Sequence, residues 1–92
     1  MEREFTILNK LGLHARPAAE FVRCARKFKA TIVIRKDGED YSAASILDVL
    51  SANLDSGSHM LVAADGPDAA KALDELARLL EQFVTQEAEE GV

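Results

Sequence analysis

Apolar residues along the chain fall into two kinds of pattern: short runs typical of strands, and longer stretches with helical spacing. Four runs predict strands, at residues 5–8, 31–34, 41–43 and 59–63. The second run, Thr-Ile-Val-Ile, is the most β-branched. Asp37-Gly38 follows it and is the kind of dipeptide that most favours a tight hairpin turn. The second and third strands are therefore predicted to pair as a hairpin.

Two stretches in the first half of the chain predict helices. The first begins near Ala15, because Pro17 is tolerated in a helix only within the first turn. Its apolar spacing continues to about Phe28. The second is short and runs from Ile46 to about Asn53.

A third helix is predicted to open at Gly66-Pro67-Asp68, since proline and an acid are typical of a first helical turn. Its core-facing stripe consists of Ala69, Leu73, Leu76, Leu80 and Phe83. Oppositely charged residues lie four positions apart on the outer face, in the pairs Lys71/Glu75 and Asp74/Arg78.

The order of predicted elements is βαββαβα, close to a split βαβ arrangement with a terminal helix. We expect an α+β open-faced sandwich, with a four-stranded antiparallel sheet and three helices on one face. Residues 1–85 are predicted to form a single domain, because a chain of 92 residues suits one small core. The polar, acidic segment 86–92 is predicted to be a flexible C-terminal tail.

Composition narrows the setting of the protein. The sequence contains no apolar run of about 18 residues that could cross a membrane, and it does not start with a signal-peptide pattern. Its only cysteine, Cys24, has no partner for an internal disulfide. A reducing, cytoplasmic location is the simplest expectation. Because Cys24 lies inside a predicted helix, we expect it to be structural rather than reactive.

The net charge of −5 argues against nucleic acid as a partner. The charge is unevenly divided: residues 1–36 contain nine Lys or Arg and three Glu, whereas residues 37–92 contain two basic and thirteen acidic residues. On the first predicted helix, Arg16, Arg23 and Lys27 fall close to one line, which Glu20 interrupts. Such a basic stripe favours docking onto acidic protein surfaces.

His14 is the main candidate for chemistry, because it lies just before the first predicted helix. The backbone N–H groups of Ala15, Arg16 and Ala18 would point back toward its ring, where the helix dipole favours negative charge. The guanidinium of Arg16 can bind phosphate through two donors. The pattern therefore indicates a phosphohistidine site. On spacing alone, His14 could equally be a polar helix cap, although Ser, Thr, Asn or Asp fill that role better.

Segment 12–19, Gly-Leu-His-Ala-Arg-Pro-Ala-Ala, resembles the active-site signature of the histidine-containing phosphocarrier (HPr) family. This family belongs to the bacterial phosphoenolpyruvate-dependent sugar phosphotransferase system. The likeness extends over roughly residues 5–84 in length, element order and motif position.

The resemblance implies that His14 accepts phosphate on Nδ1 from phospho-enzyme I and passes it to a IIA-type permease component. Arg16 would assist at the phosphate. The protein would then be a stoichiometric carrier rather than an enzyme, with no cofactor, and we expect a monomer. No P-loop or metal-spaced cluster is present in the sequence; His59 has no partner at metal-ligand spacing.

Ser45 matches a second family site, which in many members is modified by an ATP-dependent HPr kinase/phosphorylase. Its spacing from Asp48 also fits a helix-capping pattern, in which the serine hydroxyl accepts a backbone N–H. Asp48 departs from the glycine that many kinase-regulated members have there, and its carboxylate would repel a phosphoserine. Leu11 is a second departure, since well-known members have a small polar residue near the active histidine.

The second predicted helix carries more apolar residues than one short helix needs for packing. We expect part of this set to form an exposed patch beside the basic stripe, and the patch resembles the family's partner-docking surface. The candidate docking residues are Arg23, Lys27, Ile46, Leu47 and Leu50.

Two other functions remain open. A regulatory protein of the same fold would act by binding a kinase, a permease or a transcription factor. A small enzyme, such as a phosphatase, would use His14 as an acid or base, but residues 9–12 supply no partner group beyond Lys10.

Overall fold

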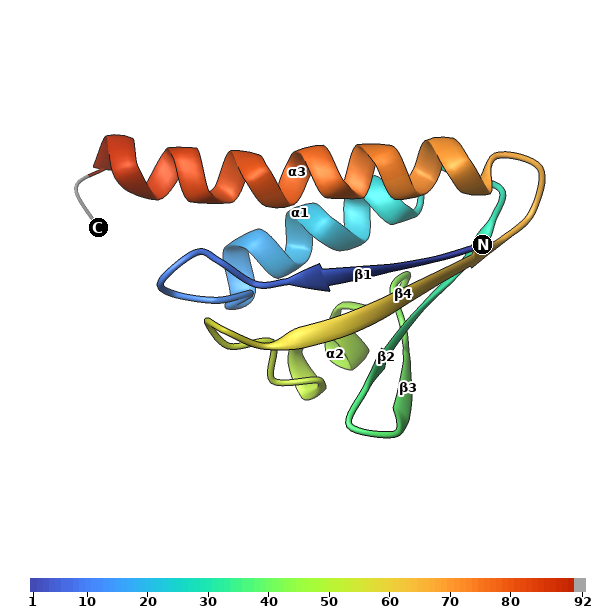
Figure 1. The fold of residues 1–92 in the computed structure, drawn as a ribbon, viewed down its shortest axis with the longest axis horizontal. Coiled ribbons are helices and arrows are strands. Elements are labelled where there is room, and N and C mark those ends of the chain that lie inside the picture. The colour runs from blue at the N-terminus through green and yellow to red at the C-terminus, as the bar shows by residue number, and fades with distance from the viewer. Residues whose placement is uncertain (91–92) are drawn as a thin grey trace.

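The computed structural model describes residues 1–90 and has a four-stranded antiparallel sheet covered on one face by three helices (Figure 1). The strands follow the spatial order β1-β4-β2-β3, so the two hairpin strands lie at one edge. The predicted fold class is confirmed. The elements are β1 (Glu2–Thr6), α1 (Ala15–Ala25), β2 (Thr31–Lys36), β3 (Glu39–Ser42), α2 (Ile46–Ser51), β4 (His59–Asp65) and α3 (Ala69–Glu90).

The core lies between the sheet and the helices. Alternate residues of the two central strands are buried, among them Ile34 on β2 and Val62 on β4, which are cross-strand partners. Phe21 of α1 and Leu76 of α3 are fully buried with them. Burying an aliphatic or aromatic side chain contributes roughly 1.5–3 kcal/mol, so these residues hold the helices on the sheet.

β1 begins and ends earlier than the predicted strand at residues 5–8. It pairs with β4 from Glu2 opposite Ala63 to Thr6 opposite His59. Its outward residues are polar because they lie on the open face of an edge strand. The apolar run therefore marked only the end of the strand, and cross-strand pairing set its true limits.

α1 and α2 are each shorter than their apolar spacing predicts. α1 ends at Ala25, and the N–H groups of Lys27 and Phe28 donate to carbonyls three residues earlier. α2 ends at Ser51, two residues before Asn53, which has a positive φ of 51°. Both ends tighten into turns of the kind that commonly finish a helix.

α3 begins one residue after Asp68, later than Gly66-Pro67-Asp68 predicts. The backbone N–H of Ala72 donates to the Asp68 carbonyl at 2.9 Å. The Asp68 carboxylate turns to the preceding part of the chain, where it accepts the N–H groups of Lys29 and Ala30, each at 2.9 Å. Asp68 thus joins the start of α3 to the loop before β2.

The segment predicted to be a flexible tail begins inside a helix: residues 86–90 continue α3, and residues 91–92 lie outside the described part of the chain. Gln, Glu and Ala dominate this segment, and all three are good helix formers. The red end of α3 lies above the blue loop that joins β1 to α1 (Figure 1). Glu87 hydrogen bonds to that loop.

The predicted pairing of Asp74 with Arg78 is replaced by a longer-range contact. Asp74 accepts from Arg3 of β1 at 2.8 Å, and both side chains are well exposed. Within residues 1–90 the other ion pair joins Arg35 to Asp40 across the β2–β3 hairpin at 2.7 Å.

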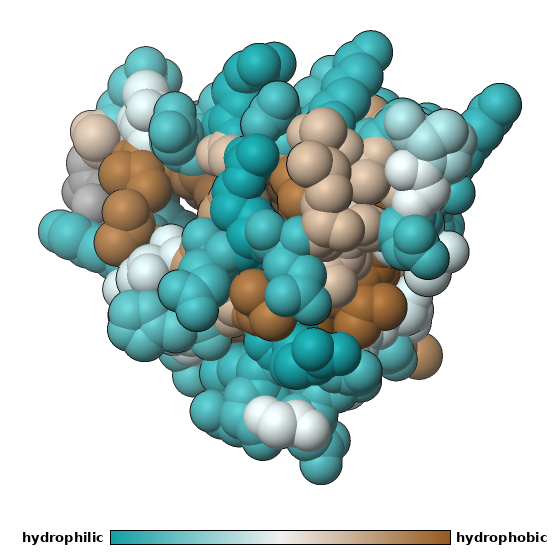
Figure 2. Space-filling model, turned by 45° about the vertical axis from the view of Figure 1, so that its right-hand side comes forward, coloured by the Kyte–Doolittle hydropathy of each residue, from teal (hydrophilic) through white to brown (hydrophobic). Residues whose placement is uncertain are grey.

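The surface seen in Figure 2 is mostly hydrophilic, with small apolar patches separated by polar side chains. No helix in residues 1–90 is long and apolar enough to span a membrane. The most exposed large apolar side chains are Met1, Leu8, Leu11 and Leu47.

Candidate functional site

His14 occupies the N-cap position of α1, with an extended backbone (φ −74°, ψ −174°). Its carbonyl accepts the N–H of Ala18 at 2.9 Å, but its side chain makes no capping hydrogen bond. The interpretation of His14 as a polar cap is therefore wrong. The imidazole is exposed and available for another role.

The loop before His14 is fixed by backbone contacts on both sides. Buried Asn9 donates through Nδ2 to the Gly12 carbonyl at 2.7 Å, and the Gly12 N–H donates back to the Asn9 carbonyl at 3.1 Å. The Leu13 N–H donates to the carbonyl of Leu54 at 2.8 Å. These bonds set the direction in which the chain enters α1 and so place the His14 side chain outside the core.

The N-terminus of α1 has fewer free N–H donors than the sequence predicts. The N–H of Ala18 donates to the His14 carbonyl, so, contrary to the prediction, it is not free to bind a phosphate. Pro17 has no N–H. The donors of the first turn are therefore the N–H groups of Ala15 and Arg16, and both residues are exposed.

A small cavity of ≈ 90 Å³ lies beside His14, where the β1–α1 loop, the first turn of α1 and the end of α3 meet. The guanidinium-bearing Arg16 lines the same cavity as His14, so the structure brings together the two residues that the sequence singled out. The remaining lining residues are Asn9, Leu11, Pro17, Glu20, Phe83, Gln86, Glu87 and Glu90.

Glu87 is a site residue that the sequence reasoning missed. Its Oε1 accepts the N–H of Lys10 at 2.6 Å, and its Oε2 accepts the N–H of Leu11 at 3.0 Å. The sequence contains a pattern that predicts its position: Glu87 follows Leu80 and Phe83 at helical spacing, so it lies on the same face of α3. The flexible tail expected at that point concealed it.

The ionisation of Glu87 reflects these contacts. Partial burial disfavours the charged carboxylate, but the hydrogen bonds from the Leu11 and Lys10 N–H groups outweigh it. Attraction to His14 acts in the same direction as these bonds, and the pKa of Glu87 lies below its usual value. Glu87 is therefore a carboxylate at neutral pH.

Ser45 is the N-cap of α2, and its Oγ accepts the backbone N–H of Asp48 at 3.3 Å. The predicted capping role is confirmed. The Asp48 carboxylate does not return the contact to Ser45 and accepts the N–H of Ser42 at 2.9 Å instead. Asp48 thus places a negative charge in the first turn of α2, near the Ser45 hydroxyl.

The candidate docking residues lie on α1, in the turn that follows it and on α2, and the two helices pack against each other. Leu47 is 73% exposed and Leu50 37% exposed, whereas Ile46 packs partly against the core. Arg23 and Lys27 are exposed and line a groove between α1 and α3.

Acidic residues lie among the basic ones in that groove. Glu20 and Glu75 line it together with Arg78. Lys27 follows the end of α1 and lies in the closing turn. The basic stripe is therefore interrupted by acids, and its last member stands outside the helix.

The remaining reactive side chains lie apart from His14. Cys24 is buried, and this burial raises the pKa of its thiol. A raised pKa makes the thiol less reactive, which agrees with a structural role. Nδ1 of His59 lies 2.9 Å from Oγ1 of Thr6 on the open face of the sheet. Within residues 1–90, no group of three or more His, Cys, Asp or Glu side chains is placed to hold a metal ion.

Comparison with known proteins places this site in a family. A family model described as "PTS HPr component phosphorylation site" matches residues 1–82. The phosphocarrier protein HPr of Borreliella burgdorferi is 37% identical over 83 residues, covering 90% of this chain and 96% of that protein.

Solved structures agree with the family match. The crystal structure of HPr-C-His from Thermoanaerobacter tengcongensis has a TM-score of 0.88 at 38% identity, covering 92% of this chain and 96% of that one. A crystal structure of an HPr dimer from the same organism has a TM-score of 0.72 at 40% identity, covering 86% and 92%. The exposed histidine at the start of α1, the sheet order and these matches agree, and the chain belongs to the HPr phosphocarrier family of the phosphotransferase system.

Proposed function

We propose that this protein accepts a phosphoryl group on Nδ1 of His14 from phospho-enzyme I and passes it to IIA-type permease components. The observation that carries the proposal is the exposed imidazole at the N-terminus of α1, whose side chain has no capping role. His59 is the only other histidine, and its Nδ1 is in hydrogen-bond contact with Thr6. The protein acts as a reactant that carries the group and needs no cofactor of its own.

The chemistry follows from the charges around His14. A neutral imidazole attacks the phosphorus atom of the donor, a new N–P bond forms, and the donor's N–P bond breaks. The product carries a dianionic phosphoryl group, which the N–H groups of Ala15 and Arg16 and the α1 dipole stabilise. The Arg16 guanidinium offers two further donors. Transfer to the acceptor reverses these steps and regenerates the neutral ring.

The test combines the protein with phosphoenolpyruvate and enzyme I, and intact mass at alkaline pH reports the phosphoryl group. We expect one acid-labile group on the wild-type protein and none on His14→Ala. His59→Ala is the matched control, because it removes the other histidine, and it should be labelled normally. Labelling of His14→Ala, or no labelling with enzyme I from the same organism, would contradict the proposal.

Partner docking is proposed for the exposed apolar residues of α2, Leu47 and Leu50, together with Arg23 of α1 and Lys27 in the turn that follows it. Apolar side chains beside cations suit a partner surface that is acidic at its rim and apolar at its centre. Leu47→Asp should weaken binding to enzyme I at least tenfold, whereas Val84→Asp on α3 should leave it unchanged. Normal binding by Leu47→Asp would exclude Leu47 from the docking surface.

Ser45 is proposed as a second, regulatory phosphorylation site for an HPr kinase/phosphorylase. A phosphate there would lie at the N-terminus of α2, where the dipole favours it, but the Asp48 carboxylate would oppose it. We expect ATP-dependent labelling of the wild-type protein and none of Ser45→Ala. Asp48→Gly should be labelled faster than the wild-type protein. Failure of a cognate kinase to label both the wild-type protein and Asp48→Gly would exclude this regulation.

We propose that the carrier works as a monomer in the cytoplasm. One surface around His14 has to meet both the donor and the acceptor, and a monomer leaves it accessible to each in turn. Light scattering after size exclusion should give the mass of one chain, 10.0 kDa. A mass of two chains would favour an arrangement such as the HPr dimer reported above.

A further inference from the structure

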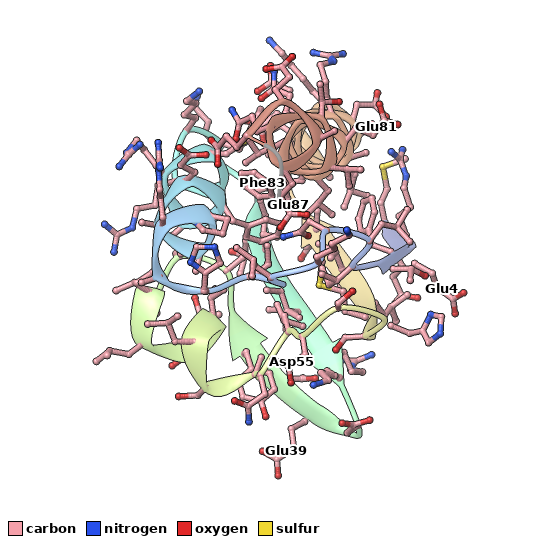
Figure 3. All side chains as sticks on the ribbon, turned by 90° about the vertical axis from the view of Figure 1, so that its left-hand side faces the viewer. Glu4, Glu39, Asp55, Glu81, Phe83 and Glu87 are labelled. Carbon is pink, nitrogen blue, oxygen red and sulfur yellow. The ribbon has the colours of Figure 1, made fainter. Side chains whose placement is uncertain are left out.

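The end of α3 contacts the loop that leads to His14 through one side chain. Figure 3 shows Glu87 and Phe83 on the side of α3 that faces the rest of the fold. The two carboxylate oxygens of Glu87 accept the consecutive N–H groups of Lys10 and Leu11, at 2.6 and 3.0 Å. Glu87 follows these two residues by 77 and 76 positions in the sequence. The contact is therefore tertiary and joins the last turns of α3 to the active-site loop.

This contact places a negative charge at the phosphohistidine cavity. Glu87 lines the same cavity as His14, and attraction between the two side chains favours the charged carboxylate. Glu20 and Glu90 line the cavity as well, and Arg16 is the one arginine among its lining residues. Among the three carboxylates, Glu87 is the one with hydrogen bonds to the loop.

We propose that Glu87 is a positioning residue for phosphotransfer: it holds the Lys10–Leu11 segment beside His14, and its charge makes the phosphorylated His14 a better phosphoryl donor. The inference rests on the proposed role of His14 as the phosphoryl acceptor. Glu87 lies outside the 12–19 motif, in the last turns of α3.

The direction of the effect follows from comparing the two states of the carrier. Before phosphorylation the His14 ring carries no negative charge, so a nearby carboxylate does not repel it. After phosphorylation the ring carries a dianion, which the Glu87 carboxylate repels. The repulsion acts only on the phosphorylated state, so it favours release of the phosphoryl group. Arg16 and the N-terminus of α1 act in the opposite direction, and the balance keeps the group transferable.

The hydrogen bonds are tested on the unphosphorylated protein by NMR. The amide proton signals of Lys10 and Leu11 should shift as acid protonates Glu87. The midpoint of this shift should lie below the usual glutamate pKa of about 4.3. This shift should be absent in Glu87→Gln and retained in Glu89→Gln, a matched charge removal on the same helix. Lys10 and Leu11 signals that titrate identically in Glu87→Gln and in the wild-type protein would overturn the positioning role.

The charge effect is tested by the lifetime of the phosphohistidine. Phosphoramidate phosphorylates histidine rings without enzyme I, so this experiment does not depend on partner docking. Glu87→Gln keeps one acceptor oxygen and removes the charge, and we expect its phosphoryl group to hydrolyse about two to five times more slowly. Glu89→Gln should match the wild-type rate. Equal lifetimes in Glu87→Gln and the wild-type protein would overturn the charge effect.

The two tests separate this inference from the proposed function. If enzyme I fails to phosphorylate the wild-type protein, the proposed function fails, while the amide titration and the phosphohistidine lifetime still report on Glu87. If enzyme I phosphorylates the protein but Glu87→Gln behaves as the wild type in both readouts, the proposed function stands and the role of Glu87 does not.

Discussion

The backbone N–H of Leu13 donates to the carbonyl oxygen of Leu54 at 2.8 Å, which ties the residue before His14 to the turn that follows α2. The two chain segments approach closely enough that only glycine fits at position 12. A Cβ on Gly12 would lie 2.6 Å from the Leu54 carbonyl oxygen and 2.9 Å from Cα of Asp55. His14 is thus positioned by a contact between two loops.

Gly12→Ala should therefore destabilise the protein and displace His14. Gly12 has a φ of +66°, so alanine adds left-handed strain to the backbone clash, and we expect a loss of about 2–4 kcal/mol in the free energy of unfolding. Urea denaturation measures this change. Gly38→Ala is the matched control: its φ is +80°, but no atom lies within 4 Å of the added Cβ. A loss at Gly12 no larger than the loss at Gly38 would contradict the close approach.

Ser45→Ala removes the side-chain cap of α2. The Asp48 N–H then loses its acceptor, and the expected cost is about 1 kcal/mol of the free energy of unfolding. Thermal or urea denaturation measures it, with Ser56→Ala in the exposed turn before β4 as a control that should change stability by less than about 0.5 kcal/mol. Equal stability of the two variants would show that the 3.3 Å contact contributes little.

The hydrogen bonds of Asp68 should make the free energy of unfolding depend on pH in the acid range. The hydrogen bond from the Lys29 N–H, aided by that from Ala30, lowers the pKa of Asp68 below its usual range despite an opposing desolvation effect. A lowered pKa in the folded state means that this contribution is complete above the unfolded pKa of about 3.9 and is lost as pH falls through the lower folded value.

Asp68→Asn should accordingly be less stable than the wild-type protein at pH 6, and the difference should shrink as the pH falls below about 4. Asp65→Asn, at the exposed end of β4, controls for removal of a charge near the same loop. Urea denaturation at several pH values measures the difference. A gap between Asp68→Asn and the wild type that stays constant down to pH 2 would contradict this role.

The Arg3–Asp74 ion pair should contribute little despite its 2.8 Å distance. Their side chains are 40% and 60% exposed, so water screens the attraction and competes for the hydrogen bond. A double-mutant cycle with Arg3→Ala and Asp74→Ala should give a coupling energy below about 1 kcal/mol. A coupling above that range would show that the pair holds β1 against α3 more strongly than its exposure suggests.

Local patterns sufficed for much of the fold and for the centre of the site. The β-branched run of β2 and Asp37-Gly38 predicted the hairpin, and Pro17 placed the start of α1. His14 then had to lie at the first turn of that helix, as it does. The Ser45 cap could be predicted for the same reason, since it depends on residues three positions apart.

Three features that the sequence did not predict depend on contacts between distant segments. β1 begins at Glu2 because β4 is available to pair with it, although its first residues are polar. Asp74 is four residues from Arg78, yet it pairs with Arg3 on another element. Composition suggested a tail from residue 86, but the helix continues there, and Glu87 bonds to a loop at the opposite end of the chain.

The assignment of His14 as the phosphoryl acceptor can be tested by long-range ¹H–¹⁵N NMR of both histidine rings. The spectra are recorded at alkaline pH after reaction with phosphoenolpyruvate and enzyme I. We expect phosphorus to be bonded to Nδ1 of His14 and the His59 ring, in contact with Thr6, to be unchanged. Phosphorylation of His59, or a His14 ring left unmodified by an enzyme I that phosphorylates another HPr, would contradict it.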